Sequence, residues 1–181
     1  MEDSNVFGSP KKISSFGGEC FIEEGHILFH GSDVIVKNPR IIVSRKKKDF
    51  GPGFYVTSIS TQAEKWARRN LLFNKNAVVS KFRYCKSINQ NLNIKIFKEV
   101  DDEWVDFIAN CRSGISHNYD IVEGPMADDK VFNFAQMYLR GELPKDIFVS
   151  YCKFNYPTHQ ICFCSERALK CLKFLESYEV R

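Results

Sequence analysis

The sequence predicts an α+β fold, because stretches with strand character and stretches with helix character follow each other irregularly along the chain. A doubly wound sheet would instead show a regular alternation of the two. The chain has 181 residues, of which 44% are hydrophobic and 27% charged, an ordinary globular composition. This length suits one well-cored domain and is short for two. We therefore expect a single domain over residues 20–181, preceded by a flexible polar arm over residues 1–19.

Seven stretches have strand composition, and glycine, proline or asparagine bounds several of them. The first ends at Gly31, and the second is a short candidate for an edge strand. The seven stretches cover residues 26–30, 41–43, 54–56, 77–84, 92–97, 119–123 and 159–163.

Helices are expected where apolar residues recur at helical spacing behind a capping residue. A first helix begins near residue 60, where Thr61 and Glu64 have the spacing of a capping box. A second begins at Asp101 and ends near Gly114. The residues expected on the apolar face of the first helix are Ala63, Trp66, Ala67 and Leu71.

Three more helices are expected in the C-terminal part. Asp128 and Asp129 precede a helix that Gly141 terminates, and a short helical piece follows Pro144. Ser165 caps a last helix. The residues that repeat at helical spacing in this last helix are Leu169, Leu172 and Leu175.

The most distinctive local motif is a turn in which Gly51 and Gly53 flank Pro52, followed by Phe54 and Tyr55. Glycine allows positive φ and close approach of another group, and proline fixes φ and removes a donor. We expect a rigid turn that delivers the two aromatic residues onto a strand. An aromatic ring held beside exposed backbone suits a flat heteroaromatic ligand. A hairpin turn that leads core aromatics inward would have the same local sequence.

Charge and hydropathy exclude several classes of protein. The net charge is +4, and the basic residues 45–48 stand directly before the turn. This run is either a solvated loop or a group that attracts phosphates or an acidic partner, and it is too short for a nucleic-acid-binding domain. No stretch reaches the ~18 apolar residues of a membrane span, and the N-terminus lacks the pattern of a signal peptide. We expect a cytoplasmic protein with no membrane partner.

The seven cysteines are expected to be reduced thiols, because their number is odd and no secretory signal precedes them. Cys162 and Cys164, with His159 nearby, form the only cluster with metal-binding composition. A second Cys or His pair at zinc spacing is missing from the sequence. We therefore expect no bound metal and assign the thiols to apolar packing.

The order of these motifs resembles the ADP-ribosyltransferase superfamily of the diphtheria-toxin and poly-ADP-ribose-polymerase type. That group is known for a His-Gly strand, a Gly-x-Gly-x-Tyr turn, a second aromatic eleven residues later, and a glutamate on a late strand. The matching residues here are His30-Gly31-Ser32, Gly53-Phe54-Tyr55, Trp66 and Gln160. The resemblance implies split mixed and antiparallel β-sheets with flanking helices, and NAD as the substrate.

More narrowly, the chain resembles an uncharacterised bacterial family allied to these transferases, from about His26 to the C-terminus. The resemblance rests on residues 29–32, 49–55, 120–129 and 158–163. Such proteins are often found beside a small partner protein, in the manner of toxin-antitoxin pairs. The implied protein is an intracellular bacterial toxin that transfers ADP-ribose from NAD to a protein or nucleic-acid acceptor and is held by a small antitoxin.

The resemblance implies a role for each matching residue. His30 would bind the adenosine ribose, the backbone of Gly31 would hold the nicotinamide amide, and Ser32 would add a hydroxyl near the same group. Tyr55 and Trp66 would sandwich the nicotinamide ring. Other residues expected to contact NAD are Phe50, Gly53 and Asp128. The alternatives are that His30 is a histidine satisfied at a strand end and that Trp66 is a core residue of an amphipathic helix.

Gln160 departs from the superfamily, which commonly has glutamate on this strand. Glutamine both donates and accepts hydrogen bonds, but it carries no charge and cannot act as a general base. Candidates for a replacement base are Glu123, Asp128, Asp129 and Glu166, among which Glu123 stands at a strand end before a Gly-Pro break. His159 precedes Gln160 and is expected on the opposite face of the strand.

Three functions are consistent with the sequence. The first is a mono-ADP-ribosyltransferase that uses His30, Tyr55, Gln160 and Glu123 in catalysis. The second is a catalytically inactive module that binds NAD or ADP-ribose. The third is an RNA 2′-phosphotransferase of related fold, although the paired His and Arg motifs of that family are not evident.

Overall fold

The computed structural model describes residues 22–43, 48–86, 91–98, 100–127, 134, 137–138, 140–152 and 158–181. The predicted arm and the start of the helix predicted after Asp129 lie outside the described residues. The described part mixes helices with two sheets, so the predicted α+β fold is confirmed. None of its helices is long and apolar enough to cross a membrane.

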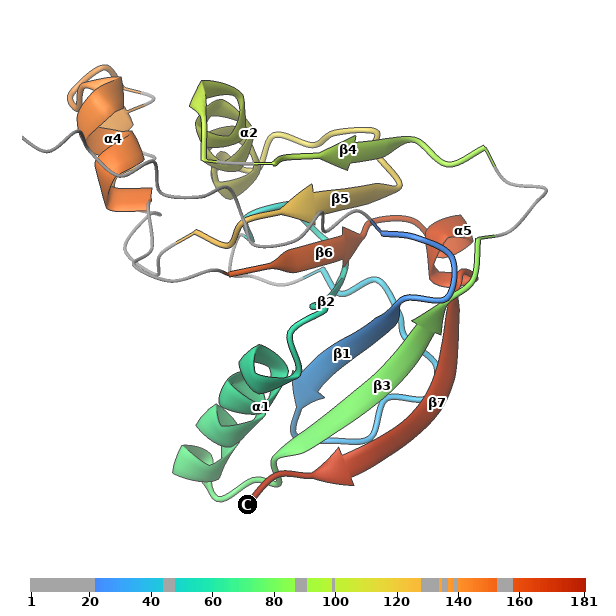
Figure 1. Cartoon of the computed structure of the whole chain (residues 1–181). Helices are drawn as coiled ribbons and strands as arrows, with labels where there is room; N and C mark the ends of the chain where they lie inside the picture. Colours follow the sequence, from blue (N-terminus) through green and yellow to red (C-terminus); the bar gives the residue numbers. More distant parts are fainter. Residues whose placement is uncertain are drawn as a thin grey trace, which may run out of the picture.

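The two sheets lie next to each other (Figure 1). One is antiparallel and three-stranded, in the order β1-β3-β7. The other has four strands in the order β2-β6-β5-β4, with β4 parallel to β5 and the remaining pairs antiparallel. The strands are β1 (Ile27–Ser32), β2 (Phe54–Val56), β3 (Val78–Tyr84), β4 (Ile94–Ile96), β5 (Ile121–Gly124), β6 (Gln160–Phe163) and β7 (Leu172–Glu179).

The sheets meet at their edge strands β1 and β2. Phe29 and Thr57 exchange two backbone hydrogen bonds, of 2.8 and 2.9 Å, across this junction. Buried residues fill the space behind it, among them Leu28, Phe54 and Phe163. The junction therefore fixes the end of β1 against the start of the first helix.

Helix α1 packs on β1, while α2 and α4 contact each other beside the mixed sheet (Figure 1). Ala63 and Ala67 bury one face of α1 against the three-stranded sheet. The core beside α2 is built around Phe50, Trp104 and Phe148, all fully buried. The helices are α1 (Ser60–Arg68), the 3-10 helix η1 (Arg69–Phe73), α2 (Asp102–Ser113), α4 (Lys145–Cys152) and α5 (Glu166–Leu169).

The predicted caps of α2 are confirmed, but the capping box of α1 is wrong. Asp101 accepts a 2.8 Å hydrogen bond from the Trp104 backbone N–H, and Gly114 ends α2 at φ 95°. Helix α1 starts one residue earlier than Thr61, and Ile59 occupies its N-cap without a side-chain hydrogen bond. Helix formation there depends on the buried alanines and not on a cap, since tertiary packing supplies most helical stability.

The last predicted helix is also wrong beyond Leu169. Ser165 does cap α5, accepting from the Ala168 N–H, but α5 is only four residues long. Leu172 then begins β7 and pairs with Tyr84, while Phe174 pairs with Phe82. Leucines three residues apart satisfy a helical pattern, but this segment pairs along its length with β3 and forms the edge of the sheet instead. The predicted strand over residues 41–43 is reduced to one bridge between Ile42 and Gly53.

Candidate functional site

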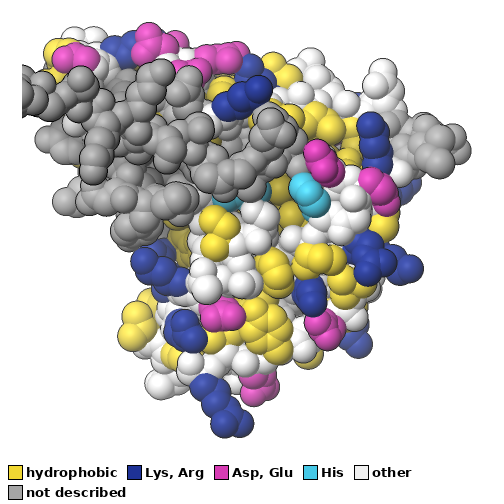
Figure 2. Space-filling model, viewed as in Figure 1, with side chains coloured by type: hydrophobic (Ala, Val, Ile, Leu, Met, Phe, Trp, Pro, Cys, Tyr) yellow, Lys and Arg dark blue, Asp and Glu magenta, His cyan; other side chains and the backbone are white. Residues whose placement is uncertain are grey.

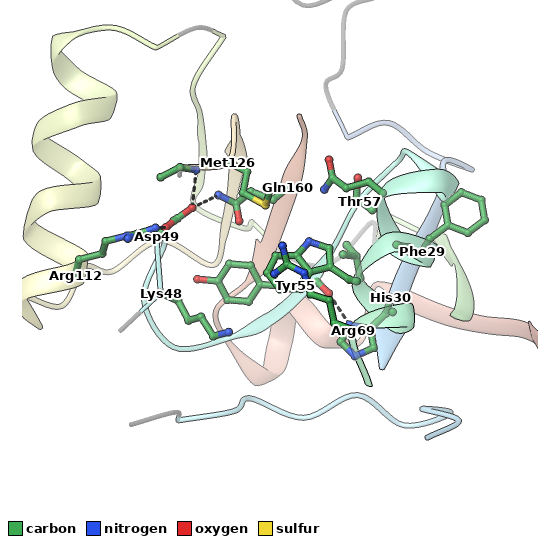
Figure 3. A pocket seen from close by; sticks show the side chains of 16 residues that line it. Phe29, His30, Lys48, Asp49, Tyr55, Thr57, Arg69, Arg112, Met126 and Gln160 are labelled. Carbon is green, nitrogen blue, oxygen red and sulfur yellow. Dashed lines mark hydrogen bonds and ion pairs between the residues drawn. The ribbon is translucent and has the colours of Figure 1, made fainter. Parts of the chain in front are cut away.

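A cavity of about 870 Å³ opens where β1, β2, β6 and α1 meet (Figure 3). Five of the residues singled out in the sequence line it together, although they come from distant parts of the chain. They are His30, Gly31, Tyr55, Trp66 and Gln160. This volume lies within the range of about 300–1,000 Å³ that is usual for small-molecule sites.

His30 is held as a neutral imidazole at the end of β1. Its Nδ1 donates a 2.7 Å hydrogen bond to the Tyr55 carbonyl oxygen, and its ring packs on Phe54 with 4.4 Å between centroids. Burial lowers the pKa of His30 below its ordinary value. With Nδ1 protonated, Nε2 of the neutral ring is an acceptor. The bond to β2 therefore fixes the orientation and the tautomer of the His30 ring.

Gly31 directs its backbone N–H and C=O toward the cavity. Phe29 directs its N–H and C=O to Thr57, away from β3, and alternate residues of a strand direct these groups to the same side. The N–H and C=O of Gly31 therefore also point away from β3, on the side of the cavity. A Cβ at this position would lie 2.1 Å from the Ala63 carbonyl oxygen. Only glycine allows α1 to pack this closely on β1.

The glycine turn holds the ring of Tyr55, as the sequence predicts. The Tyr55 hydroxyl donates to the Gly51 carbonyl oxygen at 2.7 Å and accepts from the Phe50 N–H at 3.1 Å. Gly51 has φ 75°, and a Cβ at Gly53 would lie 2.3 Å from the Cys162 sulfur. Gly51 is thus required by the conformation of the turn, and Gly53 by the close approach of β6. Burial raises the pKa of Tyr55 well above its ordinary value, so its hydroxyl stays protonated.

Trp66 reaches the cavity from the partly exposed side of α1. Ala63 and Ala67 make up the buried face of this helix, whereas Trp66 is 38% and Leu71 44% exposed. Of the four residues predicted on one apolar face, Ala63 and Ala67 are therefore buried, whereas Trp66 and Leu71 are exposed. The guanidinium of Arg69 stacks on the Trp66 ring, 3.8 Å from its centroid. The guanidinium thereby lies over one face of the ring at the cavity wall.

Gln160 lies at the start of β6 within a buried polar network (Figure 3). Its Nε2 donates to Asp49 Oδ2 at 2.8 Å and to the Pro125 carbonyl oxygen at 3.1 Å. Oδ2 also accepts from the Ala127 N–H at 2.8 Å, and Oδ1 accepts from Arg112 Nε at 2.8 Å and from Arg112 Nη2. Asp49 and Arg112 are both buried. The carboxylate is therefore neutralised by one guanidinium and bonded by four N–H groups.

Glu123 does not reach this cavity. It pairs with Ile161 across β5 and β6, whereas Gly124 pairs with Gln160. Because cross-strand partners share a face, Glu123 lies on the face opposite to Gln160. Its Oε2 accepts from the Ile22 N–H at 2.8 Å, and its Oε1 lies 3.0 Å from His159 Nε2. The structure thus corrects the placement of Glu123 in the site, and His159 lies on the opposite face as expected.

Other predicted residues support the cavity or lie elsewhere. Phe50 is fully buried in the core and Gly53 packs against Cys162. Ser32 donates to the Val34 carbonyl oxygen at 2.6 Å and does not line the cavity. Glu166 is exposed in the first turn of α5, away from the lining. Asp128 and Asp129 lie outside the described residues.

Several lining residues were not singled out from the sequence. Asp49 was only the first residue of the turn motif, and nothing local pairs it with Arg112 in α2. Gln62 lines the cavity and bonds both backbone groups of His159. Basic residues on the lining are Lys48, Arg69 and Arg112. Of these residues, only Lys48 had a signal in the sequence, because it belongs to the basic run directly before the glycine turn.

Two further expectations concern the cysteines, which were predicted to be reduced thiols, and the surface, on which basic residues could attract an anionic partner. Among the described residues, Cys85, Cys111, Cys162, Cys164 and Cys171 are free thiols, and no group of three or more metal-ligating side chains is found. Acidic and basic side chains are interspersed over the described part of the face in Figure 2. That part of the face does not carry charge of a single sign.

The comparisons with known proteins identify a family. Residues 26–174 match the family described as "Protein of unknown function (DUF3990)". This chain belongs to that family. All lining residues of the cavity, from Phe29 to Gln160, fall within the DUF3990 match. No curated protein and no solved structure matches the chain.

Proposed function

We propose that the cavity binds NAD and that the protein transfers ADP-ribose from NAD to a macromolecular acceptor. The observation that carries this proposal is the convergence of His30, Gly31, Tyr55, Trp66 and Gln160 on one cavity. These are five of the residues that the resemblance to ADP-ribosyltransferases selects, whereas Ser32, which it also selects, lies outside the lining. They come from β1, β2, α1 and β6, so only the folded chain brings them together.

Each lining group offers NAD a specific interaction. The N–H and C=O of Gly31 suit the carboxamide of nicotinamide, and the rings of Tyr55 and Trp66 supply aromatic surface at about 1–3 kcal/mol per stacked base. Nε2 of His30 accepts a hydrogen bond from a ribose hydroxyl. The cavity also has Lys48 and Arg69 on its wall, which supply positive charge for the pyrophosphate.

The reaction replaces one bond at the ribose. The bond between C1′ and the nicotinamide nitrogen breaks, and nicotinamide leaves with the electron pair as a neutral molecule. A nucleophilic atom of the acceptor forms the new bond to C1′ and releases its proton to solvent water. The protein contributes by fixing the dinucleotide and stabilising the cationic sugar of the transition state.

One observation favours a second candidate, a module that binds NAD or ADP-ribose without turnover. Gln160 stands where the superfamily commonly has glutamate, and the one carboxylate of the described lining, Asp49, is already bonded by four N–H groups. We infer that either activity would take place in the cytoplasm of a bacterium, with a small antitoxin as a further candidate partner.

The test is nicotinamide release from NAD by the purified protein, with and without bacterial lysate. We expect release by the wild type and its loss in His30→Ala and Tyr55→Ala. His26→Ala is a matched control, because His26 lies near the start of β1, outside the lining. A rise with lysate supports a macromolecular acceptor. NAD binding by calorimetry without release supports the second candidate, and no binding overturns both.

A further inference from the structure

The amide of Gln160 has a fixed orientation at the cavity wall. Both protons of Nε2 are used, one by Asp49 Oδ2 at 2.8 Å and one by the Pro125 carbonyl oxygen at 3.1 Å. The reverse orientation would bring Oε1 against two acceptors that have no proton to give. Oε1 is therefore the atom left for a ligand, and Figure 3 shows it on the side of the amide away from Asp49.

Asp49 itself has no acceptor capacity left for a ligand. A carboxylate offers about four lone-pair sites, and four N–H groups of Arg112, Ala127 and Gln160 take them. Its charge is balanced by Arg112 within the protein. This excludes Asp49 as a base that faces the cavity and leaves it one task, which is to hold the groups around it.

We propose that Asp49 is a positioning residue that holds the oxygen of the Gln160 amide toward the cavity, so that this site is built for glutamine and rejects glutamate at position 160. The role assigned to the ligand rests on the proposed function, with a ribose hydroxyl as the donor to Oε1. A glutamate there would place two carboxylates at the present 2.8 Å contact and a third acceptor at Pro125. The residue that departs from the superfamily is thus matched to its surroundings.

Gln160→Glu and Gln160→Met test this proposal against each other. Methionine has similar volume and removes the hydrogen bonds without adding charge. Glutamate adds a carboxyl whose pKa is raised by the Asp49 charge. The charged and titratable groups that share the lining with position 160 are His30, Lys48, Asp49, Tyr55, Arg69 and Arg112.

The first measurement is the thermal midpoint of each variant between pH 8 and pH 5, without ligand. We expect Gln160→Glu to melt roughly 5–10 °C below wild type at pH 8. This deficit should shrink as the pH falls, because an acid whose pKa is raised by folding destabilises the protein only while it is charged. The deficit of Gln160→Met should not depend on pH. Equal melting of Gln160→Glu and wild type at pH 8 would overturn the proposal.

The second measurement separates this proposal from the proposed function. At pH 8 we expect NAD binding about tenfold or more weaker in Gln160→Glu than in wild type. If wild type does not bind NAD, the proposed function fails while the pH-dependent melting still tests Asp49. The side-chain amide protons of Gln160 in an NMR spectrum should also move in Asp49→Asn. Unchanged amide resonances in that variant would contradict the positioning role.

Discussion

Strand β6 and the residue before it carry two buried polar networks, one on each face, and of His159 and Gln160 only Gln160 lines the cavity. On one face, His159 bridges Glu123 at 3.0 Å and the Ser58 hydroxyl at 3.0 Å. On the other, Gln160 bonds Asp49 at 2.8 Å and leaves Oε1 at a cavity. Both networks contain a carboxylate and both are buried. A network whose polar atoms all have protein partners only holds structural elements together. A network that leaves one acceptor atom at a cavity can also bind a ligand.

The largest loss of stability is expected from the network of Glu123 and His159, which does not reach the cavity. Glu123→Ala leaves the His159 ring and the Ile22 N–H without their buried partner, and each such group left unsatisfied costs about 1–3 kcal/mol. Urea unfolding measures this loss. Glu176→Ala is the matched control, since Glu176 pairs with Lys81 at the surface and should cost less than about 1 kcal/mol. A Glu123 variant as stable as this control would show that the enclosed network does not stabilise the fold.

The contact between α1 and β1 should be the next most sensitive point. Gly31→Ala places a methyl group 2.1 Å from the Ala63 carbonyl oxygen, and overpacking of this kind costs about 1–3 kcal/mol. The change also moves α1 from the cavity wall, so we expect weaker NAD binding in calorimetry. Ser32→Ala, one residue along the same strand, serves as the control. Unchanged stability and binding in Gly31→Ala would contradict the close packing.

Trp66 should separate binding from stability. Because its ring is 38% exposed, Trp66→Leu is expected to change the free energy of unfolding by less than about 1 kcal/mol. The loss of a stacking surface should weaken NAD binding by about 1–3 kcal/mol. Phe73→Leu, at the exposed end of η1, is the control that should change neither. Loss of stability without loss of affinity would assign Trp66 to the core.

The smallest effect is a pH dependence at His30. Burial lowers the pKa of His30 from the ordinary value of 6.5. Below about pH 6.5, His30 is therefore protonated to a greater extent in the unfolded chain than in the folded chain. The wild type should then lose stability relative to His30→Gln as the pH falls from about 7 to 5. Above pH 7 the difference should be constant. A slope of the opposite sign in urea unfolding would show that His30 is stabilised as a cation.

Local patterns in the sequence predicted much of the fold. The caps of α2, the rigid turn and the alternation that separates His159 from Gln160 depend on neighbouring residues, and these predictions are confirmed. The segment from Leu172 did not follow its pattern, because its partner strand lies about 90 residues earlier. Helical spacing of leucines carries no information about a distant edge that needs pairing.

The site divides along the same line. The sequence motifs predicted His30, Gly31, Tyr55, Trp66 and Gln160 as site residues. They did not predict the ion pair between Asp49 and Arg112, because 63 positions separate its partners. Glu123 was chosen for its place at a strand end, but the register of β5 and β6 directs it to the enclosed face. Register is a property of paired strands, so a single segment does not reveal it.

The turn before β2 has one more consequence. The ring of Tyr55 is anchored through its hydroxyl to Phe50 and Gly51, and the amide of Gln160 is anchored to Asp49, their neighbour. Two walls of the cavity thus share one short stretch of backbone. A substitution in that stretch would therefore move the Tyr55 ring and the Gln160 amide together. Neither wall of the cavity could change its position independently of the other.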